Sequence, residues 1–285
     1  MKKTFITMLM AFTAIIFSGC SDKGGEEGDD TQTVPTPEIP ADPQSASTSF
    51  THRLLLVQHT GTYCPNCPAM TTVLKDIAAD TEYSRLYNHV AAHSYNEAGD
   101  AAYSEAAESL SNLFCSGNYP EVTFNLTQER CGPSEAQLKE KISSLSKDKA
   151  AAGLAVAAEA SDQAIGVSVE VKAAEEGTYR VAVWVLEDNI HSVQDGATAD
   201  WQHTHSNALR QMAGKGNARI YGESLGAMKK GDKKEKTFAI EIENDWKIKN
   251  CKVLAFVTKA GANDSYDIAN SVVCKIGDSV SYEYK

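Results

Sequence analysis

Residues 60–68 read TGTYCPNCP and lie between a predicted strand and a predicted helix. Before them, residues 53–58 (RLLLVQ) form a continuous apolar run, which is typical of a strand buried on both faces. After them, residues 69–79 carry apolar side chains at helical spacing. The order strand, CxxC, helix is more specific than a CxxC pair alone, and it places Cys64 and Cys67 at the start of a helix.

This position makes Cys64 and Cys67 candidates for thiol–disulfide exchange. Unpaired N–H groups at a helix start stabilise a thiolate. Cys64 is then expected to be the exposed nucleophile, and Cys67 resolves the mixed disulfide. Two alternatives stay open. One is a permanently oxidised structural disulfide. The other is half of a zinc site, although zinc needs four ligands and no second CxxC or CxxH exists.

The chain changes its pattern near residue 150. Up to residue 149 strands and helices alternate as βαβαβα, which indicates an α/β domain. Beyond it, apolar and polar residues alternate without intervening helices, which indicates an antiparallel sandwich. The alternating apolar residues are Ile165, Val167, Val169, Val171, Tyr179, Val181, Val183, Val185, Phe238, Ile240 and Ile242.

Pro120 extends the pattern into a family resemblance. In the thioredoxin superfamily a cis-proline precedes a strand and faces the CxxC, and residues 119–122 (YPEV) resemble that feature. The resemblance covers roughly residues 50–149 and implies catalytic roles for Cys64, Cys67 and Pro120. The chain departs from it at Gln58, where thioredoxins usually bury an acid. It therefore implies a thiol–disulfide oxidoreductase of low activity, and whether the chain is an enzyme stays open. His59 is either a substitute proton acceptor or a strand-end residue.

The complete layout resembles the outer membrane protein 28-related lipoproteins. That family joins a lipidation motif, an acidic tether, a T-G-x-x-C-x-N-C-P segment and a β-sandwich. Residues 60–68 match the segment, and residues 205–210 (HSNALR) resemble a His-rich, Leu-Arg motif of the second domain. The resemblance implies an outer-membrane location, at the periplasmic face or the cell surface.

The N-terminus predicts export and lipid anchoring. Residues 1–19 combine a positive start, an apolar stretch and two small residues before Cys20, which is typical of a lipoprotein signal peptide. Acyl chains on Cys20 would bind the membrane stably. Residues 20–49 are mostly Gly, Asp, Glu, Pro, Ser and Thr, which predicts a disordered tether. The acidic run at residues 26–30 also resembles a surface-export signal.

The remaining cysteines suggest further disulfides. With Cys20 acylated, six of the seven are left, and an even number in an exported protein indicates three disulfides, with fifteen connectivities. Cys115 and Cys131 lie on either side of one predicted strand, where a disulfide would brace the loop facing the CxxC. The alternative for them is an additional redox thiol. Cys251 and Cys274 are placed symmetrically about a turn, so they could face each other across a hairpin.

His203, His205 and Arg210 form a candidate ligand site. Alternate residues of a strand share a face, so the two histidines could bind a metal. No carboxylate partner is evident, so surface histidines are the favoured interpretation and no metal is expected. Arg210 is either a structural anchor or part of the site. The net charge of −11 argues against nucleic acid, and the chain has no phosphate loop or dinucleotide fingerprint, so no cofactor is expected.

The sequence thus predicts an α/β thioredoxin-like domain at residues 50–150 and an all-β immunoglobulin-like antiparallel sandwich at residues 151–285. The predicted function is a lipid-anchored outer-membrane protein with an exchange site at CPNC and an interaction domain. The alternative is a non-catalytic surface binding or adhesion protein in which the disulfide-containing domain is only a scaffold. Expected partners are the membrane, thiol- or disulfide-bearing proteins, and a surface ligand.

Overall fold

The structure, a computed structural model, describes residues 34–96, 99–262 and 265–285. The helices are α1 (Cys67–Ala79), α2 (Glu105–Phe114), α3 (Glu135–Leu145) and α4 (Ala218–Tyr221), with 3-10 turns η1 (Asp200–His203) and η2 (Ile248–Asn250). The strands are β1 (Leu54–Thr60), β2 (Tyr87–His93), β3 (Glu121–Phe124), β4 (Arg130–Cys131), β5 (Ala152–Ala160), β6 (Ala164–Ala173), β7 (Gly177–Glu187), β8 (Ile190–His191), β9 (Thr204–His205), β10 (Ala208–Met212), β11 (Glu223–Met228), β12 (Lys233–Glu241), β13 (Cys251–Ala260), β14 (Tyr266–Lys275) and β15 (Ser279–Val280).

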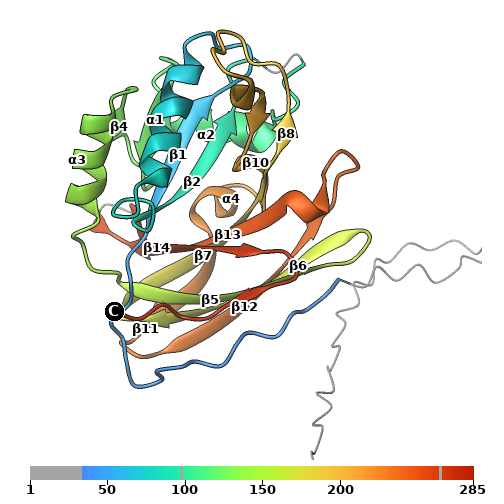
Figure 1. Ribbon diagram of the computed structural model, residues 1–285. Helices are drawn as coiled ribbons and strands as arrows, with labels where there is room; N and C mark the ends of the chain where they lie inside the picture. The colour runs from blue at the N-terminus through green and yellow to red at the C-terminus, as the bar shows by residue number, and fades with distance from the viewer. Residues whose placement is uncertain (1–33, 97–98, 263–264) are drawn as a thin grey trace, which may run out of the picture.

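Two sheets organise the described chain (Figure 1). The larger one has the strand order β14-β13-β7-β10-β2-β1-β3-β4, with β11 also paired to β7. The smaller one has the order β12-β6-β5-β15, and β8 pairs with β9 separately. Strand β10 runs parallel to β2 and antiparallel to β7, so it joins the N-terminal strands to the C-terminal ones.

The predicted fold class, a thioredoxin-like α/β domain followed by an immunoglobulin-like sandwich, is wrong. The protein is mostly β, and its nine-stranded sheet takes strands from both predicted domains. One core on this sheet contains Leu55 and Val57 of β1 together with Trp184 of β7 and Phe256 of β13. The two predicted domains merge because β10 pairs with the edge of β2, so that backbone N–H and C=O groups on this edge bond to β10 instead of solvent. The division of the chain near residue 150 stays a prediction.

Strand β1 is buried on both faces, as its apolar run predicts. Its residues Leu54 and Leu56 pack against helices α1 and α3, where the buried side chains are Met70, Leu74, Ile77, Leu138 and Ile142. Its alternate residues, Leu55 and Val57, pack against α2 on the opposite face. All seven positions of β1 are buried. This strand therefore fixes the position of the cysteine segment that follows it.

The alternating runs after residue 160 form the facing layers of the two sheets. In β6 the residues Ile165, Val167, Val169 and Val171 point into a core shared with β7, β12 and β13. The intervening residues of β6 point to the opposite side, as the strand period of two requires. That outer side is not exposed, because Ser168 and Lys172 are also buried.

The outer side of β6 is covered by residues 34–49, which we call the N-terminal segment. Figure 1 shows it running along the smaller sheet. Pro35 approaches so closely that a Cβ on Gly166 would lie 1.7 Å from the Pro35 carbonyl oxygen. The ammonium of Lys172 lies 2.9 Å from the Asp42 carboxylate, and Ile39 packs beside Phe50. The prediction of a disordered tether therefore does not hold for residues 34–49.

A buried ion pair in a mainly polar segment explains this difference. Burial by itself raises the pKa of Asp42, but hydrogen bonds from Tyr284, Lys172 and Lys233 outweigh it and hold the pKa below its ordinary value. The composition rule for disorder counts apolar residues and misses such a contact. The predicted signal peptide, Cys20 and the first part of the tether lie outside the described residues.

Candidate functional site

Cys64 and Cys67 form a disulfide with a Cα–Cα distance of 5.4 Å. The chain turns tightly after β1, where the N–H of Cys64 bonds to the carbonyl of Gly61. Helix α1 begins at Cys67, and Pro68 occupies its first turn, a position where a missing N–H costs nothing. The sequence segment is therefore placed as predicted, between a buried strand and a helix.

The disulfide is buried, contrary to the expectation of an exposed Cys64. The exposed fraction is 1% for Cys64 and 0% for Cys67. Residues 192–203, which we call the cover loop, lie against the cysteine turn. The Gln194 side-chain amide donates to the carbonyls of Thr62 and Cys64 at 3.0 Å each. A partner thiolate can therefore reach either sulfur only after residues around the cysteine turn move.

Two further contacts attach the cover loop to this region. At Gly196 (φ 70°) a Cβ would lie 2.1 Å from the carbonyl oxygen of Pro65, so only glycine permits this approach. The Gln202 amide donates to the carbonyl of Pro68 at 3.3 Å and to the hydroxyl of Thr72 at 3.1 Å. The cover loop is thus held by side-chain amides at both ends of the cysteine turn.

A buried pair, Asp100 with His93, supports the turn from the other side. The Asp100 carboxylate accepts from His93 Nδ1 and from the N–H of Thr62, at 2.9 Å each. Burial by itself raises the pKa of Asp100. The hydrogen bond from His93 and its charge outweigh this effect and lower the pKa to about 2. The Asp100 carboxylate is therefore ionised at neutral pH. It holds the N–H of Thr62, whose carbonyl accepts from Gln194.

Pro120 lies at the same end of the sheet as the cysteine turn. Strand β3 pairs antiparallel with β1, with Glu121 opposite His59, and the Tyr119–Pro120 bond is cis. Gln58 is buried and donates to the Thr71 hydroxyl at 3.1 Å. His59 bonds to two hydroxyls, those of Ser111 and Thr123, at 2.8 and 3.0 Å. Burial lowers its pKa to about 4, which is the behaviour of a neutral core histidine.

The other described cysteines do not form the two expected disulfides. Cys115, Cys131, Cys251 and Cys274 all carry free thiols. The register of the β13–β14 hairpin explains one case, since Cys274 lies opposite Val253 and not opposite Cys251. Burial, together with the negative charge of Glu187, raises the pKa of Cys251 to about 12. Burial also raises the pKa of Cys115 and Cys131, which disfavours a reactive thiolate at either position.

The candidate residues His203, His205 and Arg210 do not form one site. His203 Nδ1 accepts from the N–H of Gln194 at 3.0 Å, so it supports the cover loop. Arg210 is buried and lies 3.3 Å from the carboxylate of Glu187. Among the described residues, no group of three or more His, Cys, Asp or Glu side chains is placed to hold a metal ion.

His205 instead lines a cavity of about 470 Å³ that we call the His89 cavity. Its floor is β1 and β2, one wall is α1, and the other wall is the segment from Trp201 to Asn207. The rings of His93 and His205 meet edge to face at 4.8 Å. Burial lowers the pKa of His205 to about 4. His89 could not be predicted as a site residue, since nothing in the local sequence distinguishes it from any other strand residue.

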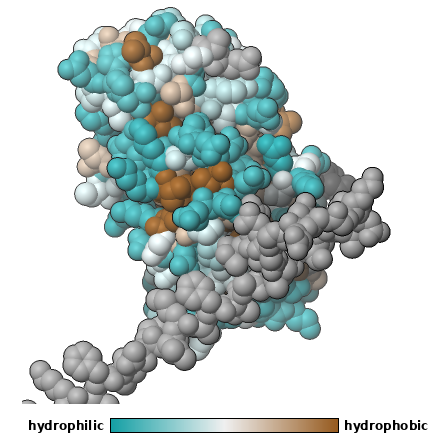
Figure 2. Space-filling view, turned by 90° about the vertical axis from the view of Figure 1, so that its right-hand side faces the viewer, coloured by the Kyte–Doolittle hydropathy of each residue, from teal (hydrophilic) through white to brown (hydrophobic). Residues whose placement is uncertain are grey.

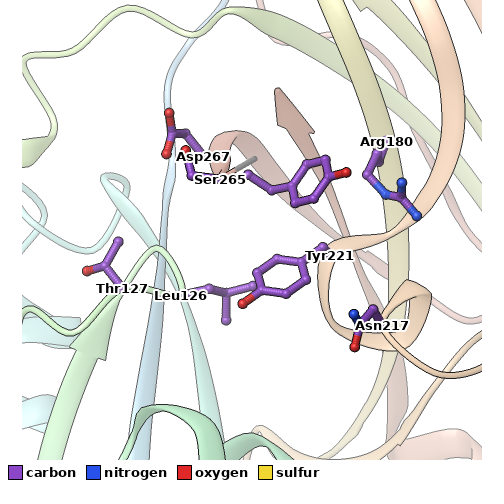
Figure 3. A pocket seen from close by; sticks show the side chains of 8 residues that line it. Leu126, Thr127, Arg180, Asn217, Tyr221, Ser265 and Asp267 are labelled. Atoms are coloured by element: carbon purple, nitrogen blue, oxygen red, sulfur yellow. The ribbon is translucent and has the colours of Figure 1, made fainter. Parts of the chain in front are cut away.

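A second cavity of about 500 Å³ lies between α4, β7, the β13–β14 hairpin and the turn after β3 (Figure 3). The rings of Tyr221 and Tyr266 are 5.6 Å apart, and the Arg180 guanidinium lies 5.1 Å from the Tyr266 ring. The Arg180 side chain also donates to the carbonyl of Gly222 at 2.7 Å.

Comparison with known families assigns the chain. The family of outer membrane protein Omp28 matches residues 107–279, more than half of the sequence. The chain belongs to the Omp28 family. The match includes the cover loop and the wall of the His89 cavity at residues 201–207. Cys64, Cys67 and the other wall, α1, lie upstream of it. The outer-membrane location implied by the sequence is therefore confirmed at the level of the family.

Solved structures show where this Omp28-family fold recurs. HBP35 of Porphyromonas gingivalis is similar with a TM-score of 0.65 and 16% identity, over 82% of this chain and 78% of that one. The protein AGR_C_4864 of Agrobacterium tumefaciens is similar with a TM-score of 0.50 and 12% identity, over 84% and 100%. At these identities the likeness concerns the fold alone. No curated protein matches this sequence.

Proposed function

We propose that this Omp28-family protein is a lipid-anchored, non-catalytic binding protein of the outer membrane, in which Cys64–Cys67 is a structural disulfide. The burial of both cysteines supports this proposal, since exchange needs direct approach of a thiolate to sulfur. Gln194 and Asp100 hold the cysteine turn from two sides, as a structural element requires. The disulfide then fixes the junction of β1, α1 and the cover loop.

The disulfide is expected to resist physiological reductants. Its reduction potential should lie below about −300 mV, whereas the reduction potentials of exchange-active pairs lie near −120 to −270 mV. The measurement is equilibration with glutathione and dithiothreitol buffers, followed by alkylation and mass spectrometry. Gln194→Ala should accelerate reduction about tenfold, because it releases the cover loop from the carbonyls of Thr62 and Cys64.

A matched control is Gln128→Ala, which removes an exposed amide that donates to the Leu113 carbonyl far from the cysteines in sequence. It should leave the reduction rate unchanged. A wild-type midpoint inside the range of exchange-active pairs, with Cys64 alkylated faster than any other thiol near neutral pH, would contradict the proposal.

Thiol–disulfide exchange is the second candidate, and one observation favours it. Cys64 and Cys67 lie at the N-terminus of α1, where N–H groups stabilise a thiolate once the disulfide is reduced. In this case the cover loop would have to open during each cycle, and Gln194→Ala would raise turnover of a disulfide substrate. Gln194→Ala thus separates the two candidate functions. A structural disulfide is only reduced faster in this variant, whereas an exchange site also turns over a disulfide substrate faster.

The membrane contact is proposed to be lipid on Cys20. None of the described helices is long and apolar enough to cross a membrane. The face shown in Figure 2 is largely hydrophilic, with hydrophobic side chains gathered near its middle. Two or more acyl chains give stable attachment to a membrane, so acyl chains on Cys20 would anchor the protein without a membrane-spanning helix.

Cys20→Ser should leave an uncut precursor that no longer partitions into the detergent phase. The reason is that cleavage and acylation both depend on this thiol. The measurement is detergent phase separation of cell extracts with detection of the protein in each phase, with Cys115→Ser as the control. Wild-type protein that stays in the aqueous phase would refute the lipid anchor.

A further inference from the structure

His89 carries a buried nitrogen without a hydrogen-bond partner. Its Nδ1 accepts from the side-chain amide of Asn207 at 3.2 Å. Burial, together with the charge of Lys252, lowers the pKa of His89 to about 4, so the ring is neutral near pH 7. A neutral imidazole with Nδ1 as acceptor carries its proton on Nε2. Among the described residues, this Nε2–H group is buried and has no partner.

Buried donors are nearly always satisfied, so an unsatisfied one calls for an explanation. His89 is among the residues that line the His89 cavity. A ligand oxygen that reaches its Nε2 from this cavity, with a small shift of the ring, would supply the missing acceptor. On the wall at residues 201–207, His205 donates through Nε2 to the carbonyl of Ser192 at 3.1 Å, which leaves its Nδ1 as an acceptor. The two histidines therefore offer a donor from the floor of the cavity and an acceptor from the wall at residues 201–207.

The rest of the lining is polar but mostly uncharged. Amides and hydroxyls predominate, and Lys75 is the sole Asp, Glu, Lys or Arg side chain among the described lining residues. The amides and hydroxyls come from Gln58, Thr60, Thr71, Ser84, Tyr87, Asn88, Thr204, Ser206 and Asn207. The Lys75 ammonium lies 4.2 Å from the centre of the Trp201 ring. Trp201 is therefore positioned by a cation–π contact on one face of its ring, and it is among the residues that line the cavity.

These features together select a ligand class. Hydroxyl groups both donate and accept, so a polyhydroxylated ring matches mixed amide, hydroxyl and imidazole groups. An indole ring also packs against the C–H face of a sugar ring. The cavity volume of about 470 Å³ accommodates a small ligand. We propose that the His89 cavity binds a neutral pyranose, either free or as the terminal unit of a glycan. This inference rests on the proposed binding function and specifies its ligand.

The test is isothermal titration of the oxidised, full mature protein in detergent with individual sugars. The probes are glucose, galactose and N-acetylglucosamine, with glucuronate as the acidic analogue and glycerol as an acyclic control. At least one neutral pyranose should bind, glucuronate should bind no more tightly, and glycerol should not bind. Trp201→Ala and His89→Leu should each weaken the affinity about tenfold or more.

Two further variants guard against loss of folding. His89→Gln keeps an amide donor and should recover part of the affinity lost in His89→Leu. Tyr266→Ala, which lines the other cavity, should leave the affinity unchanged. The inference fails if no neutral pyranose binds at tens of millimolar, if glucuronate binds best, or if neither Trp201→Ala nor His89→Leu changes the affinity.

The redox state of Cys64–Cys67 is followed separately in the same samples. Failure of sugar binding with an inert disulfide overturns only the ligand assignment. A disulfide that exchanges with physiological thiols overturns the proposed function, whatever the sugars do.

Discussion

Lys172→Met is expected to lower the free energy of unfolding by about 3 kcal/mol, since it removes the more buried of the two ammonium groups that pair with the Asp42 carboxylate and leaves that buried charge with Lys233 and Tyr284 only. The side-chain exposed fractions are 2% for Lys172 and 6% for Asp42. The Lys172 ammonium also donates to the carbonyl of Ser45 at 2.7 Å and to the Tyr284 hydroxyl at 3.1 Å. Methionine retains most of the aliphatic stem, so the loss reports mainly on these polar contacts. Urea denaturation at neutral pH measures it.

The matched control is Lys259→Met. Its ammonium lies 2.6 Å from Glu175, but the exposed fractions are 25% and 51%, so solvent screens the pair. The expected loss is below about 1 kcal/mol. Lys172→Met should also expose the N-terminal segment to a broad protease while β6 remains protected. Equal losses for the two variants would show that the Asp42 contact does not hold this segment.

Acidification is expected to destabilise the protein between about pH 6.5 and pH 4. Burial lowers the pKa of His59, His89 and His205 from 6.5 to about 4. Between these two values each of the three histidines is mostly protonated in the unfolded chain and mostly neutral in the folded chain, so stability falls as the pH decreases. Their stabilising contribution is fully present above the unfolded pKa of 6.5. Between pH 7.5 and pH 5 the combined loss should be about 6 kcal/mol.

The readout is the slope of unfolding free energy against pH, from urea curves across this range. His59→Asn should reduce the slope by about one proton even if it lowers stability at every pH. Replacement of the exposed His191 by Gln should leave the slope unchanged. Asp100, with a pKa of about 2, should contribute only at lower pH. A flat dependence between pH 6.5 and pH 4.5 would contradict the assignment of neutral buried histidines.

Several features of this protein were determined by short-range sequence patterns. The run at residues 53–58 predicts a strand buried on both faces, and β1 has cores on both sides. The period-two runs predict the strands β6, β7 and β12, whose apolar residues share one core. These predictions succeed because alternation and continuity of apolar residues are properties of a few neighbouring residues. The resemblance to the outer membrane protein 28-related family is also confirmed, by a family match over residues 107–279, whereas the thioredoxin-like fold is not.

The tertiary structure alone decided which segments meet. The pairing of Ala91 with Ala208 merges the two expected domains into one sheet, and no local pattern encodes that choice of partner. A hairpin register separates Cys251 from Cys274, although their spacing about the turn suggested a pair.

The buried Cys64 is contacted at its backbone carbonyl by Gln194, which is far from it in the sequence. The donor left on His89 follows in the same way from its contact with Asn207. Periodicity reports which face of an element is buried, whereas hydrogen bonds between distant segments determine what lies against that face.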